Sequence, residues 1–206
     1  LMLSASHNPI EWNALKFIGA SGLFLEAAEG AEMRAAMERG IAYATWDRLG
    51  HTRPDADAAR RHLDAVLALP FLDVAGIRAR RFKVVLDCCH GAGAVILPQL
   101  LEALGCEVTS IGMTPDGRFP RAPEPIAENL GEVEALVRAT GAAVGFVTDP
   151  DVDRLALVAD GGRAIGEDYT LALAAKLLLR HRQGPVVTNL STSRIVDDMA
   201  EAAGSS

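Results

Sequence analysis

Residues 82–93 read Phe-Lys-Val-Val-Leu-Asp-Cys-Cys-His-Gly-Ala-Gly, an apolar run followed by a turn that contains two glycines. A short and nearly continuous apolar run is typical of a parallel strand whose two faces are both covered. The turn predicts a helix that continues to about Leu104 and ends at Gly105, and residues 107–111 are expected to form the next strand. This order of elements predicts a right-handed crossover between parallel strands.

The same alternation continues along the chain. We expect a helix over residues 129–139, a strand over 143–148, a returning strand over 155–159 and a long helix over 167–182. Strands that alternate with helices predict an α/β fold with mixed, mostly parallel sheets and helices on both faces. Ligands of such sheets bind beyond the carboxyl ends of the strands, which is where residues 149–154 lie.

The two ends of the chain are less regular. Residues 1–3 are expected to be the end of a buried strand, residues 17–25 a hairpin and residues 26–39 a helix. Near the other end, residues 185–190 are expected to form a strand that precedes a final helix. Because the chain starts without Met and stops within a new strand–helix pair, we expect it to be a fragment.

Composition narrows the class of protein. The chain has 206 residues, which is long enough to bury a real core, and its net charge of −7 offers no basic surface for nucleic acid or for an acidic membrane. No apolar run reaches the roughly 18 residues that span a bilayer. The three cysteines, Cys88, Cys89 and Cys106, form no disulfide framework, so we expect a cytoplasmic protein. The sequence leaves the oligomeric state open.

The segment Asp149-Pro150-Asp151-Val152-Asp153-Arg154 places three carboxylates at alternate positions. In an extended segment they would project to one side, where they repel one another unless a cation intervenes. Carboxylate oxygens suit Mg²⁺. An EF-hand calcium loop is disfavoured because its sixth and twelfth positions hold Arg154 and Asp160 instead of Gly and Glu. A solvated acidic turn is the other alternative. Arg154 is expected to contact a phosphoryl group, or else to pair with one of the aspartates.

The segment Ser4-Ala5-Ser6-His7-Asn8-Pro9 places a hydroxyl on a tight loop. A nucleophilic serine together with a Mg²⁺ site predicts phosphoryl transfer. A phosphorylated Ser6 would carry about two negative charges and three acceptor oxygens, which require a cation nearby. The alternative for Ser6 is an ordinary turn serine. His7 either orients Ser6, takes part in proton transfer, or only hydrogen-bonds within the loop.

These motifs resemble those of the α-D-phosphohexomutases, which include phosphoglucomutase, phosphomannomutase and phosphoglucosamine mutase. The resemblance runs from Leu3 to about Ser193. The family motif Thr-Ala-Ser-His-Asn-Pro matches residues 4–9 with Ser4 in place of Thr, and Asn-Gly-(Ile/Leu)-Lys-(Phe/Ile) matches residues 13–17 with Ala14 in place of Gly. The other matching segments are the aspartate triplet with Arg154, Pro123-Glu124-Pro125 and Glu128-Asn129-Leu130.

The resemblance implies a role for each site residue. Ser6 is then the serine that is phosphorylated in the resting enzyme, and Lys16 is the lysine beside it, although an exposed strand lysine is the alternative. Mg²⁺ would be bound by Asp149, Asp151 and Asp153 together with a phosphate oxygen on Ser6. The implied reaction interconverts hexose 6-phosphate and hexose 1-phosphate through a bisphosphorylated sugar, with hexose 1,6-bisphosphate as primer.

The resemblance also implies repeated α/β domains. Residues 1–54 would be the end of a first domain with the phosphoserine loop (residues 4–9). Residues 55–163 would be a second domain with the metal loop (residues 149–154), and residues 164–206 the start of a third. In the family, the segments that read the sugar lie later, so the preferred hexose phosphate is not determined. A sugar phosphatase with a phosphoserine intermediate and a non-catalytic sugar-phosphate binding protein remain as alternatives.

Overall fold

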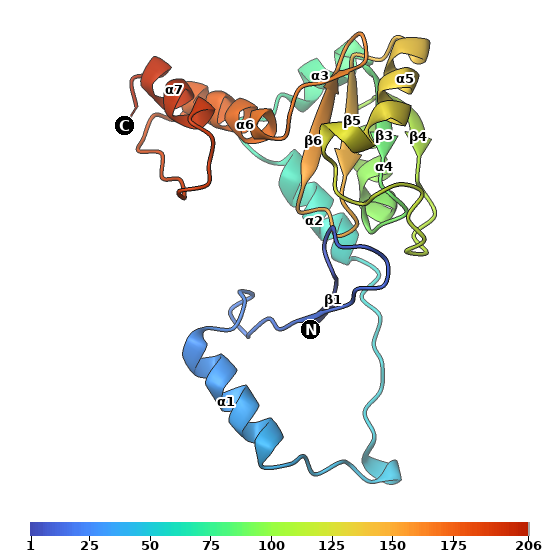
Figure 1. The fold of residues 1–206 in the computed structure, drawn as a ribbon, viewed down its shortest axis with the longest axis vertical. Coiled ribbons are helices and arrows are strands. Elements are labelled where there is room, and N and C mark those ends of the chain that lie inside the picture. Colours follow the sequence, from blue (N-terminus) through green and yellow to red (C-terminus); the bar gives the residue numbers. More distant parts are fainter. Residues whose placement is uncertain (206) are drawn as a thin grey trace.

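A computed structural model describes residues 1–205 and centres on a five-stranded sheet (Figure 1). The strand order is β4-β3-β5-β6-β7, in which β3 pairs in parallel with both β4 and β5, and β6 pairs antiparallel with both β5 and β7. The expected α/β class is confirmed. The strands are β3 (Lys83–Asp87), β4 (Glu107–Ile111), β5 (Val144–Thr148), β6 (Leu155–Ala159) and β7 (Arg163–Ala164).

The sheet is therefore mixed, with two parallel and two antiparallel pairs among these strands. The two antiparallel pairs follow from short connections. Residues 149–154 join β5 to β6, and a parallel return would need a crossover of about a dozen residues or more. The short connection leaves the segment that contains the three aspartates at the carboxyl end of β5.

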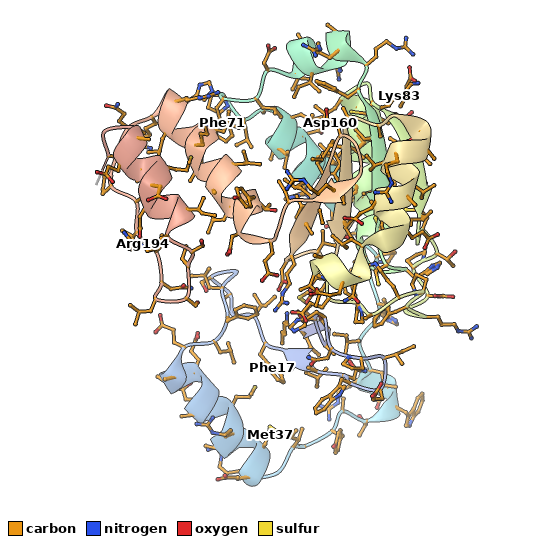
Figure 2. All side chains as sticks on the ribbon, turned by 45° about the horizontal axis from the view of Figure 1, so that its top comes forward. Phe17, Met37, Phe71, Lys83, Asp160 and Arg194 are labelled. Atoms are coloured by element: carbon orange, nitrogen blue, oxygen red, sulfur yellow. The ribbon has the colours of Figure 1, made fainter. Side chains whose placement is uncertain are left out.

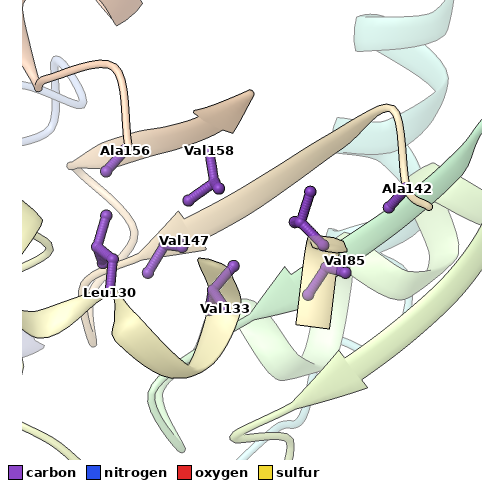
Figure 3. Close-up of a cluster of buried hydrophobic side chains, with 8 residues drawn as sticks. Val85, Leu130, Val133, Ala142, Val147, Ala156 and Val158 are labelled. Atoms are coloured by element: carbon purple, nitrogen blue, oxygen red, sulfur yellow. The ribbon is translucent and has the colours of Figure 1, made fainter. Parts of the chain in front are cut away.

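Helices cover both faces of the sheet. α5 (Gly131–Thr140) packs on one face, and α4 (Gly93–Ala103) packs on the other. Gly145 allows α5 to approach closely, because a Cβ at this position would lie 2.8 Å from a methyl group of Val133. Figure 3 shows the core cluster on the α5 side, which consists of Val85, Leu130, Val133, Val137, Ala142, Val147, Ala156 and Val158.

The N-terminal segment contains little core. β1 (Met2–Leu3) pairs antiparallel with β2 (Leu15–Lys16), and α1 (Ala27–Glu38) lies away from the sheet in Figure 1. No described residue before Leu63 is buried. The strand expected at residues 1–3 is present as β1, but the expectation that it is buried is wrong, because Leu1 is 74% and Leu3 72% exposed. The hairpin expected over residues 17–25 is confirmed by an antiparallel bridge between Ile18 and Phe24.

The C-terminal segment consists of α6 (Asp168–His181) and α7 (Ile195–Ala202), which pack against each other. The strand expected over residues 185–190 is wrong: this stretch is irregular, and Val187 is 92% exposed. A strand needs a neighbouring strand to satisfy its backbone, and none of the described strands lies beside it. The remaining helices are α2 (Ala58–Leu67), α3 (Val74–Arg80) and the short 3₁₀ helices η1 (Trp46–Arg48) and η2 (Ala127–Asn129).

Figure 2 helps to locate the edge of the sheet at which the aspartates lie. Lys83 begins β3 and Asp160 follows β6, so both mark the edge opposite the carboxyl ends of β3 and β5. Phe17 of the N-terminal segment lies toward the other end of the molecule in this view.

Among the helices within residues 1–205, none is long and apolar enough to cross a membrane.

Candidate active site

The connection after β5 folds as a tight turn. The Val152 N–H donates to the carbonyl of Asp149 over 3.3 Å, and Val152 adopts a left-handed conformation with φ of 65°. The expectation that this segment is extended is therefore wrong. The aspartates still converge, because the turn brings one carboxylate oxygen each from Asp149, Asp151 and Asp153 to within 4.8 Å of one another.

The three carboxylates fit a divalent cation. Asp149 is completely buried, and its Oδ2 has no hydrogen-bond partner among the described residues. The Oδ1 atom of Asp151 is buried and unpartnered in the same way. Buried acceptors without partners are costly unless something binds them, and carboxylate oxygens are the ligands that Mg²⁺ prefers. These residues could hold such a cation.

Burial and neighbouring charges separate the pKa values of two of these aspartates. Burial, together with the charges of Asp151 and Asp153, raises the pKa of Asp149 to about 6, against the opposing effect of a hydrogen bond from the Arg154 N–H. Burial also opposes ionisation of Asp151, but hydrogen bonds from Ser4 and Lys16 outweigh it, so the pKa of Asp151 is lowered. Of Asp149 and Asp151, Asp151 is thus the carboxylate that stays charged more easily.

We expect Asp149→Asn to stabilise the metal-free chain near neutral pH. The pKa of about 6 in the folded state lies above the ordinary value of 3.8, so the folded state binds the proton more tightly. Stability of the metal-free wild type therefore falls as the pH rises through this interval, and Asn avoids that loss. In EDTA, the variant should exceed the wild type by roughly 1 to 3 kcal/mol at pH 7.5 and match it near pH 4.

Urea unfolding at the two pH values measures this difference. Asp160→Asn, at the exposed turn between β6 and β7, is the matched control and should behave like the wild type at both pH values. Equal stability of wild type and Asp149→Asn at pH 7.5 would contradict the prediction.

The loop of residues 4–9, called the serine loop below, lies directly against the metal loop. The Ser4 hydroxyl donates to Oδ2 of Asp151 over 2.5 Å and accepts the backbone N–H of Ser6 over 2.9 Å. These bonds join segments that are 147 residues apart in sequence. Ser6 has a left-handed backbone with φ of 54°, and the side chain of Asn8 closes its loop by donating to the carbonyl of Ala5.

Two cationic side chains expected at the site take different partners. Lys16 donates to Oδ2 of Asp151 over 2.9 Å and lies 4.0 Å from Asp153, and its pKa is raised, first by the hydrogen bond to Asp151. Arg154 pairs with Glu124 over 2.5 Å, rather than with one of the aspartates. Lys16 is therefore ion-paired with the metal loop and is not a free surface lysine.

Glu124 lies in a segment that the resemblance identified, Pro123-Glu124-Pro125, but it was not predicted to be a site residue. Its Oε1 accepts from Arg154 and lies 3.7 Å from Nε2 of His7, while Nδ1 of His7 lies 3.1 Å from the Ser6 hydroxyl. Glu124 thus stands between two residues of the candidate site. The two flanking prolines restrict the backbone of Glu124, which is a sequence signal that its position is fixed. The partners of Glu124 could not be inferred from this signal.

A buried ion pair between Arg121 and Asp87 lies at the ends of the strands next to the site. Nε of Arg121 lies 2.6 Å from Oδ2 of Asp87, and the Arg121 side chain also donates to the carbonyls of Thr148 and Ala122. The other oxygen of Asp87 accepts the N–H of Cys89. This network attaches the segment that carries Glu124 to the ends of β3 and β5.

The glycine turn after β3 packs closely against the metal loop. A Cβ on Gly91 would lie 2.5 Å from Pro150, and the N–H of Ala92 donates to the carbonyl of Pro150 over 2.8 Å. The N–H of Gly91 is also used, by the carbonyl of Cys88. The amides of Gly91 and Ala92 therefore hold the metal loop and are not free to bind a phosphate.

Two hollows flank the joined loops. One, of about 570 Å³, is lined by Ser6 and Asp151 along with Trp12 and His90. The other, of about 640 Å³, lies on the side of Arg154 and Glu124 and extends to α6. A ligand in the first hollow would contact groups of both loops, whereas the second hollow is lined by residues between Glu124 and Ala174.

The chain combines an α/β sheet with a serine loop that is hydrogen-bonded to an acidic cluster, and comparison with known proteins shows its family. The model of the α/β/α domain II of phosphoglucomutases and phosphomannomutases matches residues 60–162. The chain belongs to the phosphoglucomutase/phosphomannomutase family, as its motifs indicate.

Its relatives are considerably longer. A probable phosphoglucosamine mutase of Methanopyrus kandleri is 35% identical over 99% of this chain and 44% of its own length. A phosphoglucomutase/phosphomannomutase of Thermococcus kodakarensis is 37% identical over 98% of the chain and 44% of its own length. The crystal structure of a putative phosphomannomutase from Thermus thermophilus has a TM-score of 0.80 at 27% identity and covers 99% of this chain and 46% of that protein. The chain thus spans less than half of the length of these relatives.

Proposed function

We propose that the protein containing this chain interconverts hexose 6-phosphate and hexose 1-phosphate through a phosphoserine at residue 6. The observation that supports this most is the pair of hydrogen bonds by which Ser4 joins Ser6 to Asp151. Phosphoryl transfer from a serine requires a charge-stabilising group near the hydroxyl, and binding alone would require neither the serine nor the acidic cluster.

The transfer proceeds in two balanced steps. The free sugar hydroxyl loses its proton as its oxygen attacks the phosphorus of the phosphoserine, and the bond between phosphorus and Oγ of Ser6 breaks as the new ester forms, so that Oγ takes up a proton. The resulting bisphosphorylated sugar turns around and returns its other phosphoryl group to Ser6. His7, whose Nδ1 is 3.1 Å from that Oγ, is positioned to accept and return the proton.

The cationic groups have separate roles. A Mg²⁺ held by Asp149, Asp151 and Asp153 would neutralise charge on the transferring phosphoryl group. Lys16 adds a fixed positive charge beside Asp151. Arg154 uses Nη1 for Glu124, and its other guanidinium N–H groups have no protein partner within residues 1–205, so they can bind phosphate oxygens.

The finer assignments follow the family resemblance. We propose Mg²⁺ as the cation, hexose 1,6-bisphosphate as the primer of Ser6, and a cytoplasmic location. We also propose domain boundaries near residues 54 and 163.

The protein as it is encoded should convert a hexose 6-phosphate into its 1-phosphate when Mg²⁺ and a trace of the 1,6-bisphosphate are present. Phosphorus NMR on glucose, mannose and glucosamine 6-phosphates measures this conversion and identifies the preferred sugar. EDTA should stop the reaction without changing the circular dichroism spectrum.

Other results would favour the alternatives. Release of inorganic phosphate without any 1-phosphate would favour a phosphatase. Tight binding of the sugar phosphate with no turnover, and with no phosphate on Ser6 by mass spectrometry, would favour a binding protein. Conversion that continues at full rate in EDTA would contradict the role of the cation.

A further inference from the structure

Val152 has a conformation that its side chain disfavours. It lies between Asp151 and Asp153 with φ of 65°. A β-branched residue in this region is an outlier, since the left-handed conformation brings the Cβ too close to the following carbonyl oxygen even without branching. Such strain persists when the surrounding structure enforces it.

The surroundings of Val152 are apolar. It lines a hollow of about 290 Å³ whose other walls come from β3, α4 and β5 and include Leu86, Leu101 and Phe146. Leu86 and Leu101 belong to the buried core cluster on the α4 face of the sheet, and Phe146 packs against that cluster. The middle residue of an otherwise acidic turn is thus half-buried and lines a hollow whose other walls include core residues.

We propose that Val152 is a positioning residue for the metal loop. Its apolar side chain anchors the turn to the α4-side core, and this anchoring holds the left-handed backbone that brings Asp153 together with Asp149 and Asp151. The inference rests on the proposed function in one respect, since it takes the three carboxylates to be ligands of a divalent cation.

The anchor and the backbone make different demands on residue 152. If backbone conformation alone mattered, residues that adopt positive φ easily should serve as well as valine or better, and glycine and asparagine are such residues. If the side chain holds the turn, both should be worse, whereas isoleucine should serve because it keeps the branched apolar shape and the hollow has room for one more carbon.

Calorimetric titration of the metal-free protein, as it is encoded, with MgCl₂ and with MnCl₂ tests the proposal. We expect Val152→Gly and Val152→Asn to bind either ion roughly 10- to 100-fold more weakly than the wild type, which is the range for groups that orient metal ligands. Val152→Ile should stay within about threefold of the wild type. Val187→Gly, at a valine that is 92% exposed, is the control and should leave the affinity unchanged.

Three results would overturn the proposal, and they can be told apart. Affinity in Val152→Gly equal to or higher than in the wild type would refute the anchor while leaving the cation site intact. Loss of affinity in Val152→Ile equal to that in Val152→Gly would do the same. No binding of either ion by the wild type would refute the cation site itself, and with it the proposed function. Should Val152→Gly fail to fold by circular dichroism, Val152→Ala keeps the strain while removing most of the anchor, and it should show the same weakening.

Discussion

Ser6→Ala is expected to lose its phosphate and at least a thousandfold of its mutase turnover, an order-of-magnitude figure for a removed nucleophile. The proposed reaction passes through an ester at the Ser6 oxygen. The Ser6 hydroxyl lies beside His7, and its residue is joined to the metal loop through Ser4. The hydroxyl of Ser4, the nearest alternative, already donates a hydrogen bond to Asp151. The measurement combines phosphorus NMR of the hexose phosphates with the intact mass of the protein.

The loss should not arise from unfolding. The Ser6 hydroxyl contacts His7, whereas the bond that joins the loop to Ser4 uses the backbone N–H of residue 6, which alanine retains. Ser21→Ala, in the exposed turn near residue 20, is the control and should keep both turnover and phosphate. Normal turnover in Ser6→Ala would refute the assignment of the phosphoserine.

Arg121→Met is expected to lower the free energy of unfolding by about 3–5 kcal/mol, the usual cost of removing one partner from a buried ion pair. The Arg121 side chain is 15% and that of Asp87 2% exposed, so the substitution leaves a carboxylate out of contact with both water and its cation. It also removes the donor to the carbonyl of Thr148, directly before the first aspartate of the metal loop. Urea unfolding monitored by circular dichroism measures the change.

The chain offers a matched control for this prediction. Arg60 pairs with Asp64 one helical turn away over 2.9 Å, but its side chain is 75% exposed. Arg60→Met should therefore cost no more than about 0.5 kcal/mol. The double variant Asp87→Leu/Arg121→Met should recover part of the stability, because it leaves no buried charge of this pair without a partner. A cost below about 1 kcal/mol for Arg121→Met would contradict the importance of this network.

Local sequence predicted the sheet well. The strands expected from the apolar runs near residues 82–87, 107–111 and 155–159 are present, because a run of branched apolar residues between turn residues favours a covered strand. The same reasoning failed at residues 185–190, where the apolar residues have no strand to pair with among those described. The short helix α3 was not predicted, since seven residues carry too little periodicity to be recognised.

The candidate site was predicted in part. The aspartates and Ser6 stand in short motifs whose chemistry is readable residue by residue, so their roles could be proposed from the sequence. The geometry of the metal loop was not readable, because alternate spacing fits both an extended segment and a turn. Val152 has a left-handed backbone and lines a hollow with residues of α4 and β5, and these elements lie outside the motif.

The sequence by itself determined the α/β class, which follows from local patterns of apolar and polar residues. It also determined the family and the chemical groups available for phosphoryl transfer, through short motifs that resemble those of the family. Only the tertiary structure decided how those groups are joined. Ser4 contacts Asp151, Glu124 contacts Arg154, and Arg121 contacts Asp87. The Arg121 side chain also reaches the carbonyl of Thr148, because the sheet places the ends of β3 and β5 side by side. Contacts between residues 30 or more positions apart leave no periodic trace in the sequence, so they depend on the packing of the folded chain.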